Sequence, residues 1–345
     1  MKRIPAISRQ ASRAQALVFG LQRRFVTGLE RLVRSMGGIQ RFAPVEWFRD
    51  NGLHGGGVRY QIANGDTFSR GSVNISQVHY DDNPARQLGS ATAISSIVHP
   101  CNPYAPSVHI HISWTEMKDG AGYWRIMADL NPAIEDTVAT EYFFTALKQT
   151  APDQFEEAKT VGERYFFIPA LGRRRGVAHF YLESYNSGDA EDDFSLAQHV
   201  GETAIDTWLA IVERILKEAP RVTAAAEQQQ LAYHTLYFFQ VLTLDRGTTS
   251  GLLAHNQNDA GILGSLPARV DRDLLHLWIA RLPAPQDDLL TALIAVLPEG
   301  SPSLIDEAVK MKLANIVRDH YTTHPEAIAM QASGDISPPT LRNHI

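Results

Sequence analysis

The stretch Ser107-Val108-His109-Ile110-His111-Ile112-Ser113-Trp114 alternates between polar and apolar side chains at every position. A period of two over eight residues predicts a β-strand. One face of this strand is apolar, and the other carries two histidines and two hydroxyls. Because side chains two residues apart point to the same side of a strand, His109 and His111 share the polar face.

Similar reasoning extends outward along the chain. Further strand-like segments are residues 58–62, 72–78, 93–98, 123–130 and 176–184. Helical spacing is found in residues 14–36, 135–148, 193–218, 289–297 and 303–320, the third with Asp192 or Asp193 as a candidate N-cap. Strands and helices follow no regular β–α–β rhythm, which predicts the α+β class with helices packed on an antiparallel sheet.

The N-terminus is basic and lacks the continuous apolar segment of a secretory signal. Arginine-rich starts that are poor in acidic residues also occur in organelle transit peptides. We prefer an amphipathic first helix, because apolar residues recur at helical spacing between Ala14 and Met36. These apolar residues are Leu17, Leu21, Phe25, Leu29 and Leu32.

Composition narrows the classes of function. The net charge of −6, without a dominant basic patch, argues against a nucleic-acid partner. The single cysteine, Cys101, excludes an internal disulfide and a cysteine-rich metal site, and it fits a reducing compartment such as the cytoplasm. No apolar run approaches the roughly 18 residues of a membrane span. The glycines of residues 52–57 lack the Lys-Ser/Thr of a P-loop, which argues against a nucleotide site.

Several blocks between residues 55 and 267 occur in a characteristic order. They include Gly55-Gly56-Gly57-Val58, Ser72-Val73-Asn74-Ile75-Ser76-Gln77-Val78-His79, Ser95-Ser96-Ile97-Val98-His99-Pro100-Cys101-Asn102-Pro103, Asp129-Leu130-Asn131-Pro132 and Leu244-Asp245-Arg246-Gly247-Thr248. In order and spacing this set resembles the oxygen-dependent coproporphyrinogen III oxidase family. The resemblance covers residues up to about 282, so we expect a domain at 1–282 and a helical C-terminal extension at 283–345, with a frayed tail from Ala332.

This resemblance implies a large, mostly antiparallel sheet flanked by helices, and a homodimer. It also implies a reaction, in which two propionates of the tetrapyrrole coproporphyrinogen III each lose CO₂ and two hydrogens to give the vinyl groups of protoporphyrinogen IX. Molecular oxygen is the oxidant and co-substrate. The family is generally viewed as needing no organic cofactor, and we expect no metal here.

The resemblance also implies site residues. His109, Asp129 and Asp245 are the expected catalytic residues, since a carboxylate can accept hydrogen bonds from pyrrole N–H groups or deprotonate one of them. The expected substrate-binding set is Ser95, His99, Arg175 and Arg246. In this set an arginine can hold a propionate bidentately, and His99 serves as a structural hydrogen-bonding group. An aspartate at such a position can also be a turn or helix cap.

Several family positions have changed. Ser113 and Asn258 stand where the family has arginines, and we hypothesise that Arg125 restores one of these charges. Ala139 and Ala170 stand where the family has histidines sometimes assigned to a metal, which excludes a four-histidine site in this arrangement.

Three other functions therefore remain open. The chain could be an enzyme of the same fold acting on another, less carboxylated substrate, or a non-catalytic protein that binds a tetrapyrrole or a partner. A metal-dependent enzyme using His109 and His111 is a further alternative, although two histidines alone are a weak signal.

Overall fold

The computed structural model describes residues 1–218 and 220–332. Its centre is one seven-stranded sheet in the order β1-β2-β3-β4-β5-β6-β9, in which every neighbouring pair is antiparallel. The strands are β1 (Ala43–Phe48), β2 (Gly55–Ala63), β3 (Phe68–His79), β4 (Leu88–Pro100), β5 (Ser107–Met117), β6 (Gly122–Asn131) and β9 (Ala178–Tyr185). The α+β class is confirmed, and every predicted strand is present.

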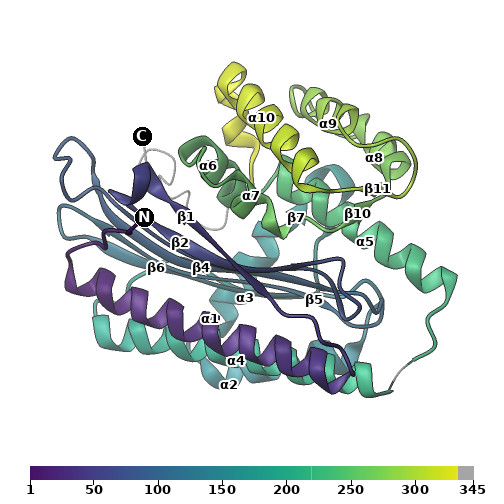
Figure 1. Ribbon diagram of the computed structural model, residues 1–345, viewed down its shortest axis with the longest axis horizontal. Coiled ribbons are helices and arrows are strands. Elements are labelled where there is room, and N and C mark those ends of the chain that lie inside the picture. The colour runs from purple at the N-terminus through teal and green to yellow at the C-terminus, as the bar shows by residue number, and fades with distance from the viewer. Residues whose placement is uncertain (219, 333–345) are drawn as a thin grey trace.

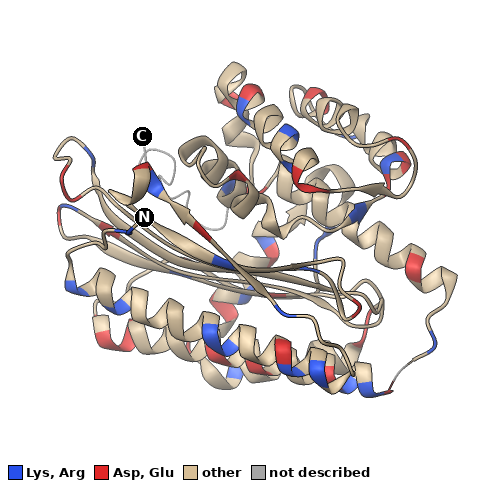
Figure 2. Cartoon of the chain, in the orientation of Figure 1, with Lys and Arg blue, Asp and Glu red and all other residues tan. Residues whose placement is uncertain are grey.

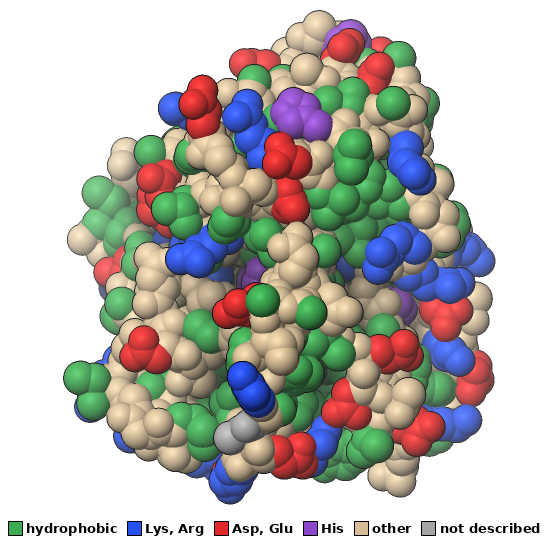
Figure 3. All heavy atoms as spheres, turned by 90° about the vertical axis from the view of Figure 1, so that its right-hand side faces the viewer, with side chains coloured by type: hydrophobic (Ala, Val, Ile, Leu, Met, Phe, Trp, Pro, Cys, Tyr) green, Lys and Arg blue, Asp and Glu red, His purple; other side chains and the backbone are tan. Residues whose placement is uncertain are grey.

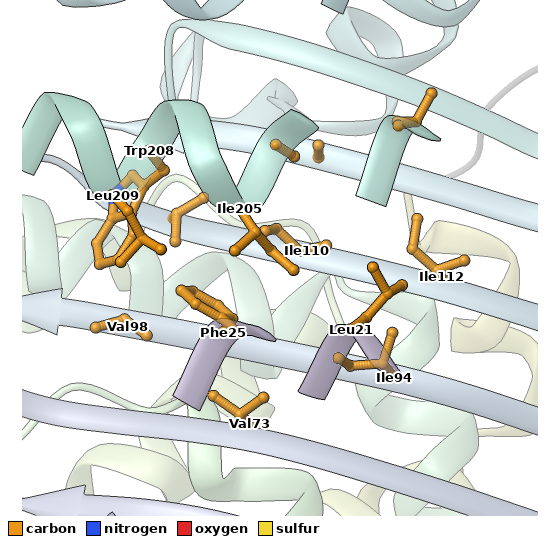
Figure 4. Close-up of a cluster of buried hydrophobic side chains, with 14 of the residues drawn as sticks. Leu21, Phe25, Val73, Ile94, Val98, Ile110, Ile112, Ile205, Trp208 and Leu209 are labelled. Atoms are coloured by element: carbon orange, nitrogen blue, oxygen red, sulfur yellow. The ribbon is translucent and has the colours of Figure 1, made fainter. Parts of the chain in front are cut away.

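Long helices cover one face of this sheet (Figure 1). They are α1 (Arg9–Ser35), α2 (Thr137–Thr150) and α4 (Ala190–Glu218), while α3 (Phe155–Tyr165) packs against β9. The predicted amphipathic first helix is confirmed, because the apolar side of α1 is buried. Phe25 of α1 meets the indole of Trp208 of α4 edge-on, with ring centres 5.6 Å apart, over apolar strand residues such as Ile110 (Figure 4).

A second group of helices covers the opposite face of the sheet. They are α5 (Ala224–Thr243), α6 (Arg246–Ala254), α7 (Asp259–Ile262), α8 (Arg272–Ile279), α9 (Gln286–Ala295), α10 (Glu307–Thr323) and the 3₁₀ segments η3 (Leu263–Ser265) and η4 (Pro325–Met330). A second apolar core joins α5 to α8, α9 and α10, so the helices beyond residue 282 share a core with α5. The domain boundary at 282 stays a prediction, and the predicted frayed tail lies outside the described residues from 333 onward.

Small elements complete the fold. Two two-stranded ribbons pair β7 (Phe167–Ile168) with β8 (Arg173–Arg174), and β10 (Arg269–Val270) with β11 (Ser303–Leu304). Single 3₁₀ turns are η1 (Arg49–Gly52) and η2 (Pro169–Leu171). Acidic and basic side chains are mixed along the helices and over one face of the molecule (Figures 2 and 3). None of the described helices is long and apolar enough to cross a membrane.

The predicted cap of the long helix α4 was wrong. The helix begins at Ala190, and the side chain of Asp189 accepts hydrogen bonds from the amides of Glu191 (2.9 Å) and Asp192 (3.1 Å). Asp193 instead accepts a hydrogen bond from the Ser187 hydroxyl at 2.6 Å, across the preceding turn. Four acidic residues stand close together here, and only the one before the first turn can reach its unpaired amides.

The predicted helix at residues 303–320 also begins too early. Ser303–Leu304 forms β11, and the helix starts at Glu307, where the side chain of Asp306 accepts from the Val309 amide at 2.8 Å. An acidic cap three residues before a free amide is a stronger start signal than the apolar spacing that we followed. The aromatic and β-branched stretch 232–244 lies within helix α5, because both sides of it are buried.

The glycine run of β2 is required by close backbone packing. A Cβ atom on Gly57 would lie 1.9 Å from the Ile75 carbonyl oxygen, so the strands could not keep their spacing. We expect Gly57→Ala to lower the free energy of unfolding by about 1–3 kcal/mol, measured by urea denaturation. The control is Gly20→Ala within α1, where a Cβ meets nothing within 4 Å and should stabilise slightly. Equal stability of the two variants would contradict this account.

Candidate active site

A cavity lies between the polar face of the sheet and the helices α5 to α7. The enclosed space that water can occupy has a volume of about 270 Å³. The atom-free space that also includes the open mouth is about 1650 Å³. The enclosed volume of about 270 Å³ lies just under the roughly 300–1,000 Å³ of ordinary ligand pockets, so a macrocyclic ligand would also occupy the open mouth. Alternate residues of four neighbouring strands form the floor, and they include Ser72, Asn74, Ser76, Ser95, His109, His111, Ser113, Thr115, Arg125 and Met127.

Strand register explains this floor. Asn74 pairs with Ser95, Ser95 pairs with His111, and His111 pairs with Met127, so one row of side chains crosses four strands on a single face. The period-two pattern of residues 107–114 therefore defines the cavity face, as well as the strand. The buried side-chain oxygen of Asn74 has no hydrogen-bond partner, as is common where a ligand supplies one.

A buried ion-pair cluster lies beside the floor, on the same face of the sheet, where Asp129 pairs with His109. Asp129, fully buried on β6, accepts a hydrogen bond from Nδ1 of His109 at 2.8 Å and faces Nη2 of Arg175 at 3.2 Å. The side-chain amide of Asn131 donates to the same carboxylate at 2.5 Å. His109 and Arg175 line the cavity, whereas Asp129 does not. Asp129 therefore holds two cavity residues in place without reaching the cavity surface.

The ionisation of Asp129 follows from these partners. Burial alone would favour the protonated acid, but the charges of Arg175 and His109 outweigh it and lower the pKa of Asp129 to about 2. A carboxylate at Oδ1 requires His109 to donate from Nδ1. The other ring nitrogen, Nε2, is then left for a group in the cavity.

Arg175 is a buried guanidinium with unsatisfied donors. It lies between two aromatic rings, 4.4 Å from the centre of Phe166 and 4.7 Å from that of Tyr237. Nε and Nη1 of Arg175 have no hydrogen-bond partner, although Nη2 faces Asp129. A buried donor without a partner costs free energy comparable to a lost hydrogen bond, so this arginine is prepared for an anionic ligand.

Asp245 and Arg246 line the roof of the same cavity, at the start of α6. One oxygen of Asp245 accepts from the Thr248 amide at 2.6 Å, which makes it the N-cap of α6, and the other accepts from the Tyr165 hydroxyl at 3.0 Å. Asp245 thus has both the capping role and the cavity position that the sequence left open. Arg246 is paired with the buried carboxylate of Glu183, which fixes its direction.

His99 lies outside the cavity. Its ring is fully buried, with Nδ1 at 2.8 Å from the Ser107 hydroxyl and Nε2 at 3.1 Å from the Ser265 carbonyl oxygen. Burial, together with nearby His234, lowers the pKa of His99 well below its usual value, so the ring is neutral. This position ties β4 to the η3 segment of the roof. It is consistent with a structural hydrogen-bonding role. His99 would influence a bound substrate through its hydrogen bond to Ser265, which lines the cavity.

Two of the four changed family positions, Ser113 and Asn258, line the cavity. Ser113 pairs across the sheet with Arg125, and both side chains line the cavity. Arg125 therefore lies opposite the position of the missing arginine, as the hypothesis of charge restoration requires. Asn258 lies at the roof and contributes no charge. Burial and the charge of Arg125 lower the pKa of His111 to about 3, which keeps that ring neutral.

The cavity thus brings together five of the seven expected residues, Ser95, His109, Arg175, Asp245 and Arg246. Asp129 lies behind His109 and Arg175, and His99 lies within the roof support. Sequence reasoning assigned no role to Tyr165, Glu183 or Tyr237, which orient the acid and the two arginines. Tyr165 begins the segment Tyr165-Phe166-Phe167, which also resembles the family, and this resemblance could have pointed to Tyr165. Glu183 and Tyr237 lie in β9 and α5 and gave no signal along the chain.

The potential metal-ligating side chains are scattered over the described residues. In residues 1–218 and 220–332, no three His, Cys, Asp or Glu side chains are grouped so that they could hold a metal ion. His109 already uses Nδ1 on Asp129, and Ala139 of α2 is buried in the apolar core on the other side of the sheet. A histidine in place of Ala139 would therefore lie on the opposite face of the sheet from His109.

Comparisons with known proteins agree with the order of the blocks. The sequence model of the family described as coproporphyrinogen III oxidase matches residues 13–277. Similar curated proteins are the mitochondrial oxygen-dependent coproporphyrinogen-III oxidases of Rattus norvegicus and Mus musculus, each 28% identical, and of Homo sapiens, 27% identical. The matches cover 71%, 71% and 69% of this chain. They span only 60%, 60% and 57% of those relatives' own lengths.

Proposed function

This chain belongs to the coproporphyrinogen III oxidase family, and we propose that it converts two propionates of coproporphyrinogen III to the vinyl groups of protoporphyrinogen IX. Each propionate loses CO₂ and two hydrogens, and molecular oxygen accepts the electrons. The observation that carries the proposal is the cavity itself. Three guanidiniums, Arg125, Arg175 and Arg246, line one space together with the carboxylate of Asp245.

The arginines would bind the propionates. Nε and Nη1 of Arg175 each need an acceptor, and a propionate carboxylate can take one of these hydrogen bonds. Three cations around a cavity with one lining acid also match a substrate that carries several carboxylates. The ion pairs to Asp129 and Glu183 hold two of these guanidiniums in position before substrate arrives.

Asp245 would act on the pyrrole nitrogens. The Thr248 amide and the Tyr165 hydroxyl each occupy one lone pair of its carboxylate, which leaves further acceptor capacity on both oxygens. Pyrrole N–H groups can donate to them. Removal of one such proton makes the pyrrole electron-rich enough to react with oxygen directly.

Asp129 is better described as a positioning residue. It fixes the direction of His109 and Arg175 through direct contacts, and it is separated from the cavity by both of them. His109 would then present Nε2 to the substrate, as an acceptor for a pyrrole N–H or as a group that relays a proton. This assignment replaces the expectation that Asp129 itself faces the ring.

Three finer points complete the proposal. We propose that the reaction uses no organic cofactor and no metal, as the family resemblance implies. We propose the cytoplasm as the location of the enzyme, in keeping with the single cysteine, Cys101. It would be a homodimer, as the family resemblance implies, and sedimentation of the purified protein measures that directly.

Arg125 offers a prediction about substrate affinity. We expect Arg125→Leu to raise the KM for coproporphyrinogen III at least about tenfold, because one charge-assisted contact to a propionate is worth about 1.5–3 kcal/mol. Adding Ser113→Arg should restore part of the loss, since the two residues are cross-strand partners. An unchanged KM in Arg125→Leu would show that this arginine does not bind substrate.

Aerobic incubation of the purified chain with coproporphyrinogen III tests the function. Protoporphyrinogen IX and an intermediate with three propionates should appear, with consumption of oxygen. Tight binding of porphyrins without oxygen consumption would identify a non-catalytic binding protein instead. Turnover of a less carboxylated tetrapyrrole alone would assign the same chemistry to another substrate.

A further inference from the structure

Buried cations gather at a second cavity, beside the end of β2 and the start of β3. This cavity has a volume of about 340 Å³, and Arg41, Arg70, Gln61, Gly264, Glu307 and Lys310 contribute to its wall. Arg59 lies beside it and donates from Nε to the lining side chain of Gln61 at 2.8 Å. Gly264 faces this cavity and Ser265 faces the candidate active site, so η3 separates the two.

The cations are more deeply buried than surface charges normally are. Arg59 is 4% exposed, Arg70 is 7% exposed and Lys310 is 2% exposed. Lysine and arginine are almost never buried to this degree without a partner. Desolvation lowers the pKa of all three groups, which means that their charged forms are costly where they lie.

Acidic partners do not balance these charges. Among the described residues lining the cavity, Glu307 is the one acid, and its side chain is 57% exposed. It accepts from the Lys310 ammonium at 2.8 Å. Arg70 donates from Nη2 to the Ile305 carbonyl at 2.6 Å, while its buried Nε has no hydrogen-bond partner. The exposed Asp306 adds a second negative charge near Arg70, so two exposed carboxylates stand against three buried cations and Arg41 at the rim.

We propose that this second cavity binds a phosphate group, presented as the free ion or as a phosphate ester. The orphaned Nε of Arg70 would donate to one phosphate oxygen and the ammonium of Lys310 to another. Guanidinium and ammonium groups together suit a tetrahedral dianion, which has more acceptor oxygens and more charge than one carboxylate. The bound dianion would offset the desolvation of the buried cations. Phosphate binding at this second cavity does not depend on the proposed oxidase activity.

Calorimetric titration of the full chain with inorganic phosphate tests this site. Saturable binding is expected for the wild type, at least about tenfold weaker binding for Lys310→Met and Arg70→Gln, and several-fold weaker binding for Arg41→Gln at the exposed rim. The matched control is Lys312→Met, which removes an exposed lysine from the same helix and should bind phosphate as the wild type does. Arg246→Gln locates the binding, because it alters only the other cavity.

Thermal unfolding separates a binding role from a structural one. Without phosphate, Lys310→Met should unfold no earlier than the wild type, because it removes a desolvated charge. With phosphate, the wild type, Lys312→Met and Arg246→Gln should show a clear upward shift, and Lys310→Met should not. A parallel titration with glycerol phosphate distinguishes an ester from the free ion, and stronger binding of either supports the site. Absence of saturable phosphate binding, equal affinity in all variants, or a loss confined to Arg246→Gln would overturn the proposal.

Discussion

Replacing Asp245 by asparagine is expected to slow turnover of coproporphyrinogen III by about 10²–10⁴-fold, the usual contribution of a positioned acid–base group. Asparagine keeps an amide oxygen that can still accept from the Thr248 amide, so α6 should remain capped. It cannot take a proton from a pyrrole N–H. The fall should therefore appear in kcat, with little change in thermal stability.

The matched control for this variant is Asp271→Asn. Asp271 caps α8 through the amides of Asp273 and Leu274, and it does not line the cavity. The same substitution at this second cap should leave turnover unchanged. If Asp245→Asn kept full activity, or if both variants lost activity equally, the acid–base role of Asp245 would be wrong.

The second large effect concerns stability. Asp129→Asn is expected to lower the free energy of unfolding by about 3–5 kcal/mol, measured by urea denaturation at neutral pH, because it leaves the guanidinium of Arg175 buried without its counter-charge. Asparagine has nearly the same volume as aspartate, so the loss would report charge and not packing. The double variant Asp129→Asn with Arg175→Met should recover part of the loss, since no charge is then stranded. A single variant as stable as the wild type would contradict the ion-pair cluster.

The same carboxylate gives the stability a dependence on pH. The pKa of Asp129 falls from an ordinary 3.8 to about 2 in the folded protein, so the folded state holds the ionised form more strongly. Its contribution is complete above pH 3.8 and is lost as the pH falls towards 2, and it amounts to roughly 2 kcal/mol. The difference in stability between wild type and Asp129→Asn should therefore shrink by roughly 2 kcal/mol over this acidic range, and a constant difference would be inconsistent with the assigned pKa.

Much of the sheet could be predicted from alternation. In residues 109–113 each second side chain lines the cavity, and this pattern alone separates His109 and His111 from Ile110 and Ile112. The cross-strand neighbours could not be predicted. That Arg125 lies opposite Ser113 depends on strand register, which the turn at residues 118–121 sets and the apolar pattern does not.

The depth of the acids was equally beyond sequence reasoning. Asp129 and Asp245 both stand in blocks that match the family, yet only Asp245 reaches the cavity. Asp129 contacts His109 of β5 and Arg175 of the segment before β9. These two residues line the cavity in place of Asp129. Helix starts were missed for a local reason, since several acidic residues near Ala190 could each have capped the helix.

The most direct test is a crystal structure of the chain with coproporphyrinogen III bound under anaerobic conditions, which prevent turnover. We predict the macrocycle in the cavity between the sheet and α6, with pyrrole nitrogens within hydrogen-bond distance of Asp245 and a propionate within hydrogen-bond distance of Arg175. A macrocycle bound elsewhere on the protein, or one seated here with Asp245 and Arg175 out of reach, would contradict it.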